Sequence, residues 1–196
     1  MIVGITGGLG CGKSTAARAF EGRGFRRLDS DQIVRDTVLT NPEVISAVRA
    51  RYGEAVIGRD GSRETIDRPA LADRVFGQDE ELRWLENLTH PRVFEVWRHA
   101  FANAPDARWA VEVPLLYEKA LENWFDFTVC VACAPAQQLA RLEQRGLPRV
   151  LAGQRISKQL PLAKKIELSD SVLWNEGSAR FLEAQVDRLA NALSDA

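Results

Sequence analysis

The stretch from Gly7 to Ser14 has the residue types and spacing that bind phosphate groups. It reads Gly7-Gly8-Leu9-Gly10-Cys11-Gly12-Lys13-Ser14, which fits the pattern G-x-x-x-x-G-K-[ST]. Glycines let the main chain turn tightly and present successive N–H groups, and a helix beginning at the lysine adds its positive dipole end. Lys13 is expected to reach the β- and γ-phosphates of ATP, and Ser14 to offer its hydroxyl to Mg²⁺. The predicted nucleotide contacts are Gly8, Gly10, Cys11, Gly12, Lys13, Ser14 and Thr15.

The alternative is a glycine-rich turn that matches by chance, but the loop directly follows an apolar run, as the motif requires. The loop alone does not distinguish a kinase from an ATPase or a GTPase switch. The chain has no N-K-x-D tetrapeptide for reading guanine, and its 196 residues are few for a motor or transport ATPase. These features favour a small kinase that transfers the γ-phosphate of ATP to a hydroxyl of a small molecule.

Two carboxylates, Asp29 and Asp31, follow a second apolar run at residues 25–28. In a parallel sheet the carboxyl end of this strand lies at the same edge as the phosphate loop, so the carboxylates face the phosphates. A hydroxyl acceptor needs a carboxylate to take its proton or to orient it. The alternative is that one of these residues caps a helix that starts near Gln32.

Short apolar runs alternate with amphipathic segments along the chain, which indicates an α/β protein. The predicted strands cover residues 1–5, 25–28, 109–113, 127–133 and 172–174. Because these runs are almost continuously apolar and are separated by helices, they predict a parallel sheet with helices on both faces. The fold class is therefore α/β, a three-layer P-loop kinase fold with a five-stranded parallel sheet, helices on both faces and a helical insertion.

No convincing strand is apparent between residues 30 and 104, which predicts a mostly helical insertion. The predicted helices of the insertion are 34–39, 42–52, 69–76 and 78–101, with a turn at Asp60-Gly61 and a kink or division at Pro91. Outside it, helices are expected at 13–21, at 135–168 with a break at 146–148, and at 178–193. We expect one domain with a core of residues 1–30, 105–134 and 169–196, an insertion at 31–104 and a further helical part at 135–168.

Composition limits the classes of partner. The chain has 26 Lys and Arg against 27 Asp and Glu, a formal net charge of -1, which gives no electrostatic case for nucleic acid or an anionic membrane. No apolar run reaches the ~20 residues of a membrane span, and no signal peptide is evident, so a cytoplasmic location is expected. No obligate protein partner is evident either.

The three cysteines are interpreted as free thiols. Cys130 and Cys133 should point to opposite faces of a strand and be buried, and without a second pair they do not predict zinc. Cys11 lies in the phosphate loop, where we expect it to react with thiol reagents and to be protected by ATP.

Several segments together resemble the dephospho-CoA kinase family over nearly the whole chain. They are Met1–Thr15, Asp29-Ser30-Asp31, His90-Pro91, Pro114-Leu115-Leu116-Tyr117-Glu118 and residues 155–178, which include Lys165, Ser169-Asp170 and Asn175-Glu176-Gly177-Ser178. The resemblance implies transfer of the γ-phosphate of ATP to the ribose 3′-hydroxyl of dephospho-CoA, with ADP and CoA as products. It also implies that Asp31 is the base or orienting residue with support from Asp29, that the insertion binds CoA, and that residues 135–168 form a lid over ATP.

Further site residues follow from these motifs. His90, Leu115, Leu116, Tyr117 and Glu118 are expected on the acceptor side, with core packing the alternative for the two leucines and a helix kink with a capping histidine the alternative for His90. Glu112 either holds Mg²⁺ together with Ser14 or pairs with a nearby arginine. Arg145 is expected to stabilise charge on the transferred phosphoryl group, with Arg141, also expected at ATP, as its competitor.

Asn175 and Gly177 are expected to frame the adenine, with a helix-terminal turn as the alternative. The sequence departs from the family pattern at four places. Cys11 stands where Ser or Ala is commoner, Glu112 where Asp is usual, Ser169 where Ala is usual, and an expected Asp after Arg145 is missing. None of these departures changes Lys13 or Asp31.

Overall fold

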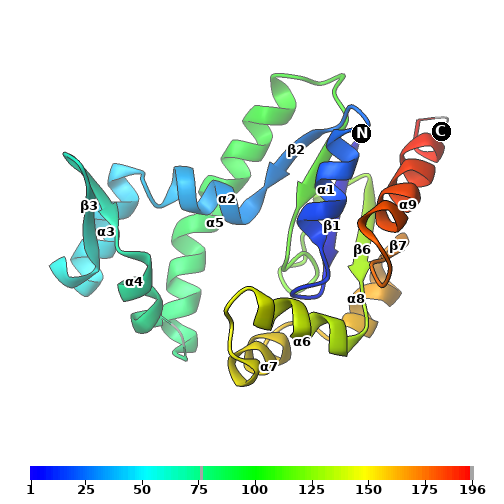
Figure 1. Cartoon of the computed structure of the whole chain (residues 1–196). Helices are drawn as coiled ribbons and strands as arrows, with labels where there is room; N and C mark the ends of the chain where they lie inside the picture. The colour runs from blue at the N-terminus through cyan, green and yellow to red at the C-terminus, as the bar shows by residue number, and fades with distance from the viewer. Residues whose placement is uncertain (76, 195–196) are drawn as a thin grey trace. The chain divides into compact units, whose positions relative to one another are not determined.

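The computed structural model describes residues 1–75 and 77–194, and these fall into two compact units. One unit is formed by residues 1–29 together with the residues from 106 onward, and the other is Ser30–Pro105. The units are coloured by residue number in Figure 1. Within the described residues, no helix combines the length and the apolar character needed to cross a membrane.

The first unit is built on a parallel sheet of five strands in the order β2-β5-β1-β6-β7. This confirms the predicted fold class and all five predicted strands. β1, which carries the phosphate loop, lies at the centre between β5 and β6. The strands are β1 (Ile2–Gly7), β2 (Arg26–Asp29), β5 (Trp109–Glu112), β6 (Phe127–Ala132) and β7 (Ser171–Trp174).

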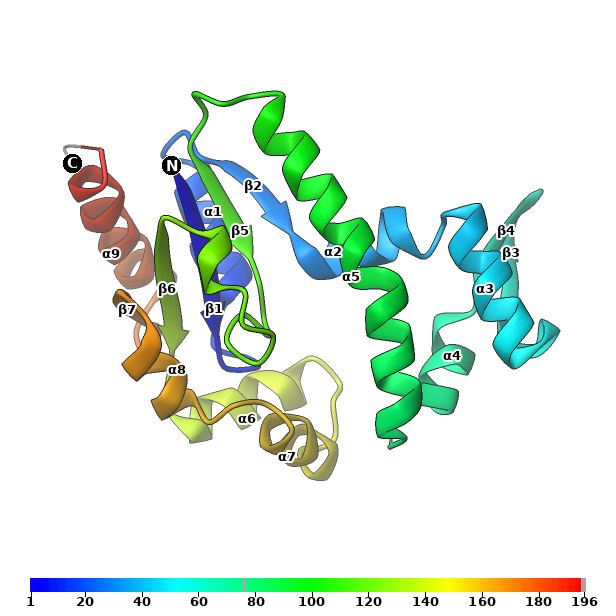
Figure 2. The same cartoon turned by 180° about the vertical axis from the view of Figure 1, so that it is seen from behind.

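Side chains of β1 alternate between two covered faces, which explains its continuous apolar character. Val3 and Ile5 are fully buried in the core that α1 (Lys13–Glu21) and α9 (Ala179–Ala192) share with the sheet. Figure 1 shows these two helices side by side over the sheet. Gly4 faces the other way, where a β-carbon would lie within 3.0 Å of the side chains of Phe125 and Leu116. Figure 2 shows the segment after β5 and the helix α8 (Leu162–Leu168) from this side.

Three helices occupy the predicted helical stretch at 135–168. They are α6 (Pro135–Gln144), α7 (Arg149–Ser157) and α8. The break between α6 and α7 falls where the sequence predicts it, because Gly146 adopts a φ of 82° that ends the helix. α6 lies against the phosphate loop, where a β-carbon on Gly10 would be 3.0 Å from the carbonyl oxygen of Gln138.

The second unit is mostly helical, as expected, but it also contains a β-hairpin. Its helices are α2 (Ser30–Ile33), a π-helical segment (Val34–Val38), α3 (Pro42–Tyr52), α4 (Arg68–Val75) and α5 (Asp79–Ala102). The hairpin pairs β3 (Ile57–Asp60) with β4 (Arg63–Ile66) in antiparallel register. The expectation of no strand in this region is therefore wrong. Four-residue strands are too short for an alternation that sequence could reveal, although the turn at Asp60-Gly61 was predicted and Gly61 has a φ of 61°.

Pro91 does not divide α5, which is one continuous helix. Proline removes one helical N–H donor and crowds the preceding turn. The Arg92 side chain donates a hydrogen bond from Nη1 to the carbonyl oxygen of Leu88, 3.0 Å away, in that same turn. Elsewhere the predicted helix ends agree closely with the structure, and Phe76, the last residue of a predicted helix, lies outside the described residues.

Candidate active site

The phosphate loop joins β1 to α1, and glycines give it its shape. Gly7, Gly10 and Gly12 have φ angles of 139°, 80° and 97°, a region in which residues with a β-carbon are strained. A β-carbon on Gly12 would also lie only 2.2 Å from Nδ2 of Asn175. The loop therefore needs glycine at this position both for its backbone conformation and for close packing.

Lys13, Ser14 and Thr15 form the first turn of α1, where helical N–H groups lack carbonyl partners within the helix. The ammonium of Lys13 donates to the carbonyl oxygens of Gly7 at 3.2 Å and Gly8 at 3.1 Å, so it lies over the loop. A lysine charge and the positive end of a nine-residue helix therefore act at the same place. This arrangement favours a polyanion such as a triphosphate.

A chain of polar contacts joins β2, β5 and the first turn of α1 at the carboxyl edge of the sheet. Ser14 Oγ donates to Glu112 Oε2 at 2.7 Å, and Arg27 Nε donates to Glu112 Oε1 at 2.8 Å. Nη2 of Arg27 also reaches Asp29 Oδ2 at 3.3 Å. Asp29 and Glu112 are direct neighbours in the register of β2 and β5. The strand topology therefore brings Asp29, Ser14 and Glu112 together, as the sequence predicts for residues at one edge.

Both interpretations of Glu112 are compatible with these contacts, because Glu112 pairs with an arginine and also bonds Ser14, the other predicted magnesium ligand. Glu112 is 3% exposed, and its carboxylate is oriented by its contacts with Ser14 and Arg27. Among the described residues no group of three His, Cys, Asp or Glu side chains is placed to hold a metal ion. A site that uses one hydroxyl, one acid and phosphate oxygens needs no such group.

Asp31 and His90 belong to the second unit. Asp31 is exposed and lies within the first turn of α2, which begins at Ser30 rather than near Gln32, so it does not occupy the capping position. His90 is half-buried in the middle of α5, with its ring centroid 6.1 Å from that of Phe94. A residue in a helix interior does not cap the helix, which removes the alternative that His90 is a cap.

Asn175 ties the loop after β7 to the phosphate loop. Its side-chain Nδ2 donates to the carbonyl oxygen of Cys11 at 2.8 Å, and its own carbonyl oxygen accepts from Nη2 of Arg141 at 2.8 Å. Arg141 is thereby held against the segment expected to frame adenine. Arg145, the last predicted member of this group, is exposed at the carboxyl end of α6. Gly177 follows in the same loop, packed against the ring of Phe181.

The expectation that Cys11 is open to thiol reagents is wrong. The side chain is fully buried, and its sulfur lies 3.4 Å from the sulfur of Cys133 and 2.9 Å from Nε2 of Gln138. The loop therefore turns this side chain into the core, and the main-chain groups of Cys11 are bonded to Gly8 and Asn175. Cys130 and Cys133 are buried as predicted.

The segment after β5 contains residues with different roles. Leu116 is fully buried against β1, so the core-packing alternative applies to it, whereas Leu115 is half-buried. The Tyr117 hydroxyl contacts Thr128 Oγ1 at 3.1 Å, near the amino end of β6. Since the phosphate loop lies at the opposite, carboxyl end of the strands, the structure does not bring this hydroxyl to the predicted site. Glu118 pairs with Lys165, which lies in α8.

Two residues with prominent contacts are missing from the predicted site. Arg27 lies two residues before Asp29 in β2, and residues two apart in a strand point to the same face. The spacing of these residues could therefore have placed Arg27 beside Asp29. Lys165 is fully buried, and only its place in the family-like segment at 155–178 drew attention to it.

The parallel sheet, the glycine loop and the lysine at the start of α1 together define a P-loop nucleotide-binding protein of the small kinase type. Solved structures agree with this class. The crystal structure of TT1252 from Thermus thermophilus superposes with a TM-score of 0.83 at 31% identity, covering 98% of this chain and 97% of that chain. A dephospho-CoA kinase from Campylobacter jejuni (TM-score 0.67, 20% identity, 100% and 98% covered) and a shikimate kinase from Acinetobacter baumannii (0.54, 16%, 97% and 93%) share the fold.

Sequence comparison gives the particular family. The family model described as dephospho-CoA kinase matches residues 1–180. A dephospho-CoA kinase of Thermosynechococcus vestitus is 42% identical over 193 residues, which cover 97% of this chain and 94% of the relative. One from Corynebacterium efficiens is 36% identical over 191 residues, covering 95% and 94%. The chain belongs to the dephospho-CoA kinase family, which confirms the resemblance drawn from its motifs, and it is an ATP-dependent kinase.

Proposed function

We propose that this enzyme transfers the γ-phosphate of ATP to the ribose 3′-hydroxyl of dephospho-CoA, giving ADP and CoA, the last step of coenzyme A synthesis. Family membership supports the reaction. The assignment of individual residues rests on the geometry at the carboxyl edge of the sheet.

The phosphate loop and Lys13 hold the β- and γ-phosphates in this proposal. Main-chain N–H groups of the loop and of the start of α1 bind the phosphate oxygens, and the ammonium of Lys13 stabilises the charge that develops as the γ-phosphate is transferred. The contacts of Lys13 with the carbonyl oxygens of Gly7 and Gly8 support this role, because they place the ammonium over the loop. Arg141 and Asn175 support the nucleotide from the side of α6 and β7.

Ser14 and Glu112 are the proposed holders of Mg²⁺. Their oxygens lie 2.7 Å apart, and hydroxyl and carboxylate oxygens are the ligands that Mg²⁺ prefers, so the donor set fits. When bound, the ion neutralises charge on the β- and γ-phosphates. Arg27 fixes the direction of the Glu112 carboxylate from the opposite side.

Asp31 acts on the acceptor in this proposal, accepting a hydrogen bond from the 3′-hydroxyl and orienting it for in-line attack. Asp29, two residues earlier at the end of β2, supports it and is itself held by Arg27. The insertion, with His90, and the segment 114–118 bind the remainder of dephospho-CoA. Residues 135–168 form a lid whose Arg145 reaches the transferred group while excluding water.

The observation that carries this proposal is the Ser14–Glu112–Arg27–Asp29 chain beside the phosphate loop, because it joins donor and acceptor residues at one edge of the sheet. The test is an assay in which ADP release is coupled to a recorded signal and CoA is identified by mass. ADP formation should depend on added dephospho-CoA, and shikimate or adenosine should not replace it.

The variant Asp31→Asn tests the proposed role of Asp31 on the acceptor hydroxyl. It should lower kcat by about 100-fold or more while the Kd of ATP changes by less than about threefold, because general-base catalysis typically contributes this much. The variant Asp36→Asn, an exposed acid farther along the same unit, is the control. A wild-type kcat in Asp31→Asn would remove this residue from the mechanism, and ADP release that ignores dephospho-CoA would refute the proposed reaction.

A further inference from the structure

Lys165 is a fully buried lysine that the proposed reaction does not use. It lies in α8, and its Nζ pairs with Oε1 of Glu118 at 2.9 Å. The same ammonium donates to the carbonyl oxygen of Pro114 at 2.7 Å. Because a buried lysine is costly unless it is paired and hydrogen-bonded, these two contacts determine where the segment 114–118 lies.

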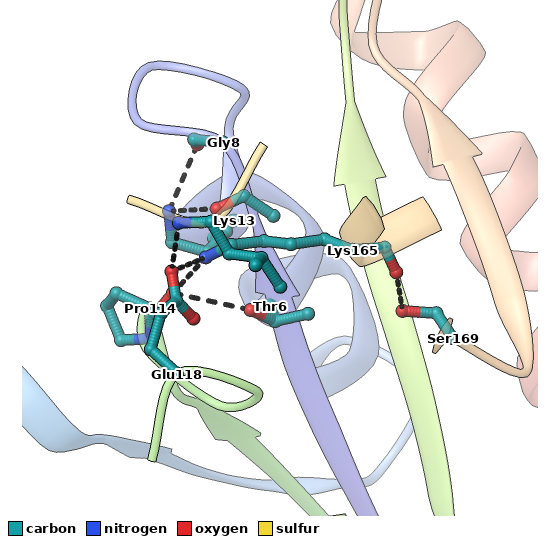
Figure 3. A network of polar contacts seen from close by, with 9 residues as sticks. Thr6, Gly8, Lys13, Pro114, Glu118, Lys165 and Ser169 are labelled. Carbon is teal, nitrogen blue, oxygen red and sulfur yellow. Dashed lines mark hydrogen bonds and ion pairs between the residues drawn. The ribbon is translucent and has the colours of Figure 1, made fainter. Parts of the chain in front are cut away.

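The site of this pair is the carboxyl edge of the sheet, beside the phosphate loop. The carbonyl oxygen of Pro114 also accepts a bond of 3.4 Å from Thr6 Oγ1, and Thr6 directly precedes the loop glycine Gly7. Figure 3 shows the side chains of Lys13, Lys165 and Glu118 converging beside Pro114, with the ammonium of Lys165 in contact with the Glu118 carboxylate. The pair therefore fixes the path of the chain immediately after β5, two residues beyond Glu112.

Glu118 also contacts the segment between α7 and α8. Its Oε1 accepts a hydrogen bond from the main-chain N–H of Leu160 at 2.9 Å. Leu160 belongs to the proposed lid, close to where the lid rejoins the core through α8. One carboxylate oxygen thus binds both the ammonium of Lys165 and the main-chain amide of Leu160, which lie near the end of the proposed lid. The other carboxylate oxygen, Oε2, is buried without a hydrogen-bond partner among the described residues.

Stability alone is a weak reason for such a pair, since replacing a buried ion pair by apolar groups is often neutral or stabilising. Directionality is a better reason, because three polar contacts at known distances join residues 114–118 to residues 160–165, two segments that are far apart in sequence. We propose that Glu118 and Lys165 form a latch that positions the acceptor-side segment 114–118 and anchors the end of the lid to it. Lys165 is thus a positioning residue that acts through Pro114 and Glu118. This inference rests on the proposed function, because it takes the segment and the lid to serve the transfer reaction.

The test compares Lys165→Met, Glu118→Gln and the double variant that carries both changes. Lys165→Met leaves the Glu118 carboxylate buried without its counter-charge and should lower Tm by roughly 10 °C. The double variant removes both charges and should recover most of this loss. Lys164→Met is the control, because Lys164 is the preceding residue of α8 and forms an exposed pair with Glu167.

The kinetic readout separates positioning from folding. In the double variant kcat should stay roughly tenfold to 100-fold below wild type, the loss that a displacement of about 1 Å causes, while KM for ATP changes by less than about twofold. The ratio of ADP to CoA formed should rise above that of wild type, because a lid that lacks its anchor admits water. The three variants should show similar kinetic losses, since they remove one shared contact.

Amide exchange gives a readout that does not depend on the reaction. The N–H of Leu160 should exchange more than about tenfold faster in the double variant than in wild type or Lys164→Met, because its acceptor is no longer held in place. The latch is refuted if the double variant recovers wild-type kcat together with Tm, or if exchange at Leu160 is unchanged. Failure of the proposed reaction appears separately, as a wild-type enzyme that makes no CoA while the exchange difference persists.

Discussion

Arg27 offers a sharp test of the edge geometry, because one guanidinium holds two of the proposed functional carboxylates. Its Nε lies 2.8 Å from Glu112 Oε1, and its Nη2 lies 3.3 Å from Asp29 Oδ2. The Arg27→Met variant keeps most of the apolar stem and removes the charge. Glu112 then keeps its hydrogen bond from Ser14 but loses its ion pair with Arg27.

The size of the effect follows from burial. Removing one partner of a buried pair costs about 3–5 kcal/mol in the free energy of unfolding. The side chains of Arg27 and Asp29 are each 21% exposed, whereas that of Glu112 is 4% exposed, so the Glu112 contact dominates and the lower end of the range applies. For a chain of this size, about 3 kcal/mol corresponds to a fall in Tm of roughly 6–12 °C.

The assay combines thermal unfolding with the dependence of kcat on Mg²⁺ concentration. Since a carboxylate without its arginine no longer has a fixed direction, the Mg²⁺ concentration for half-maximal activity should rise by about tenfold. The control is Arg26→Met at the preceding, exposed position of β2, where the guanidinium lies 5.7 Å from the ring centroid of Trp109. Arg27→Lys should lie between wild type and Arg27→Met, because lysine keeps the charge but cannot bridge two carboxylates in a plane.

A wild-type Tm in Arg27→Met would refute the reasoning about burial. An unchanged Mg²⁺ dependence with a lowered Tm would separate the two claims, leaving Arg27 as a stabilising residue that does not orient the magnesium ligand.

Two further predictions concern acid stability and thiol reactivity. The hydrogen bond from Arg51 lowers the pKa of Glu81 from 4.5 to about 2, so the stabilisation it gives is present above about pH 4.5 and is lost as the pH falls towards 2. Acid unfolding followed by tryptophan fluorescence should therefore become less steep in Glu81→Gln than in the exposed control Glu80→Gln, and identical curves would contradict this. Burial raises the pKa values of Cys130 and Cys133 to about 12, and all three thiols of the chain are buried. A disulfide reagent should thus react at pH 7.5 only at the rate of unfolding, with or without ATP, and fast labelling of the native protein would refute the burial.

The central strands and the phosphate loop could be predicted from sequence because their signals are local. Residues 127–132 are almost continuously apolar, and the glycine pattern at 7–12 has few other uses. The hairpin of β3 and β4 was missed for the opposite reason. Its strands carry charged residues such as Glu64, which pairs with Arg49. Neither strand has an apolar face long enough to show the two-residue alternation of a β-strand.

The contacts of the site depend on topology more than on pattern. Asp29 and Glu112 become neighbours only because β2 and β5 pair across the whole insertion. The burial of Cys11 depends on the direction in which the loop turns its side chain, and the pairing of Lys165 with Glu118 joins segments that no local rule connects. Sequence spacing therefore predicted which residue types belong to the edge, while the sheet order was needed to give their partners.

The central place of β1 has a consequence for synthesis on the ribosome. This strand is made before its two neighbours, which begin at Trp109 and Phe127. The nascent chain therefore carries an apolar strand without these partners until they have emerged. Pairing across roughly a hundred residues is slow compared with local helix formation. The nucleotide-binding loop, which packs closely against a residue as late as Asn175, is therefore among the last features that a newly made molecule acquires.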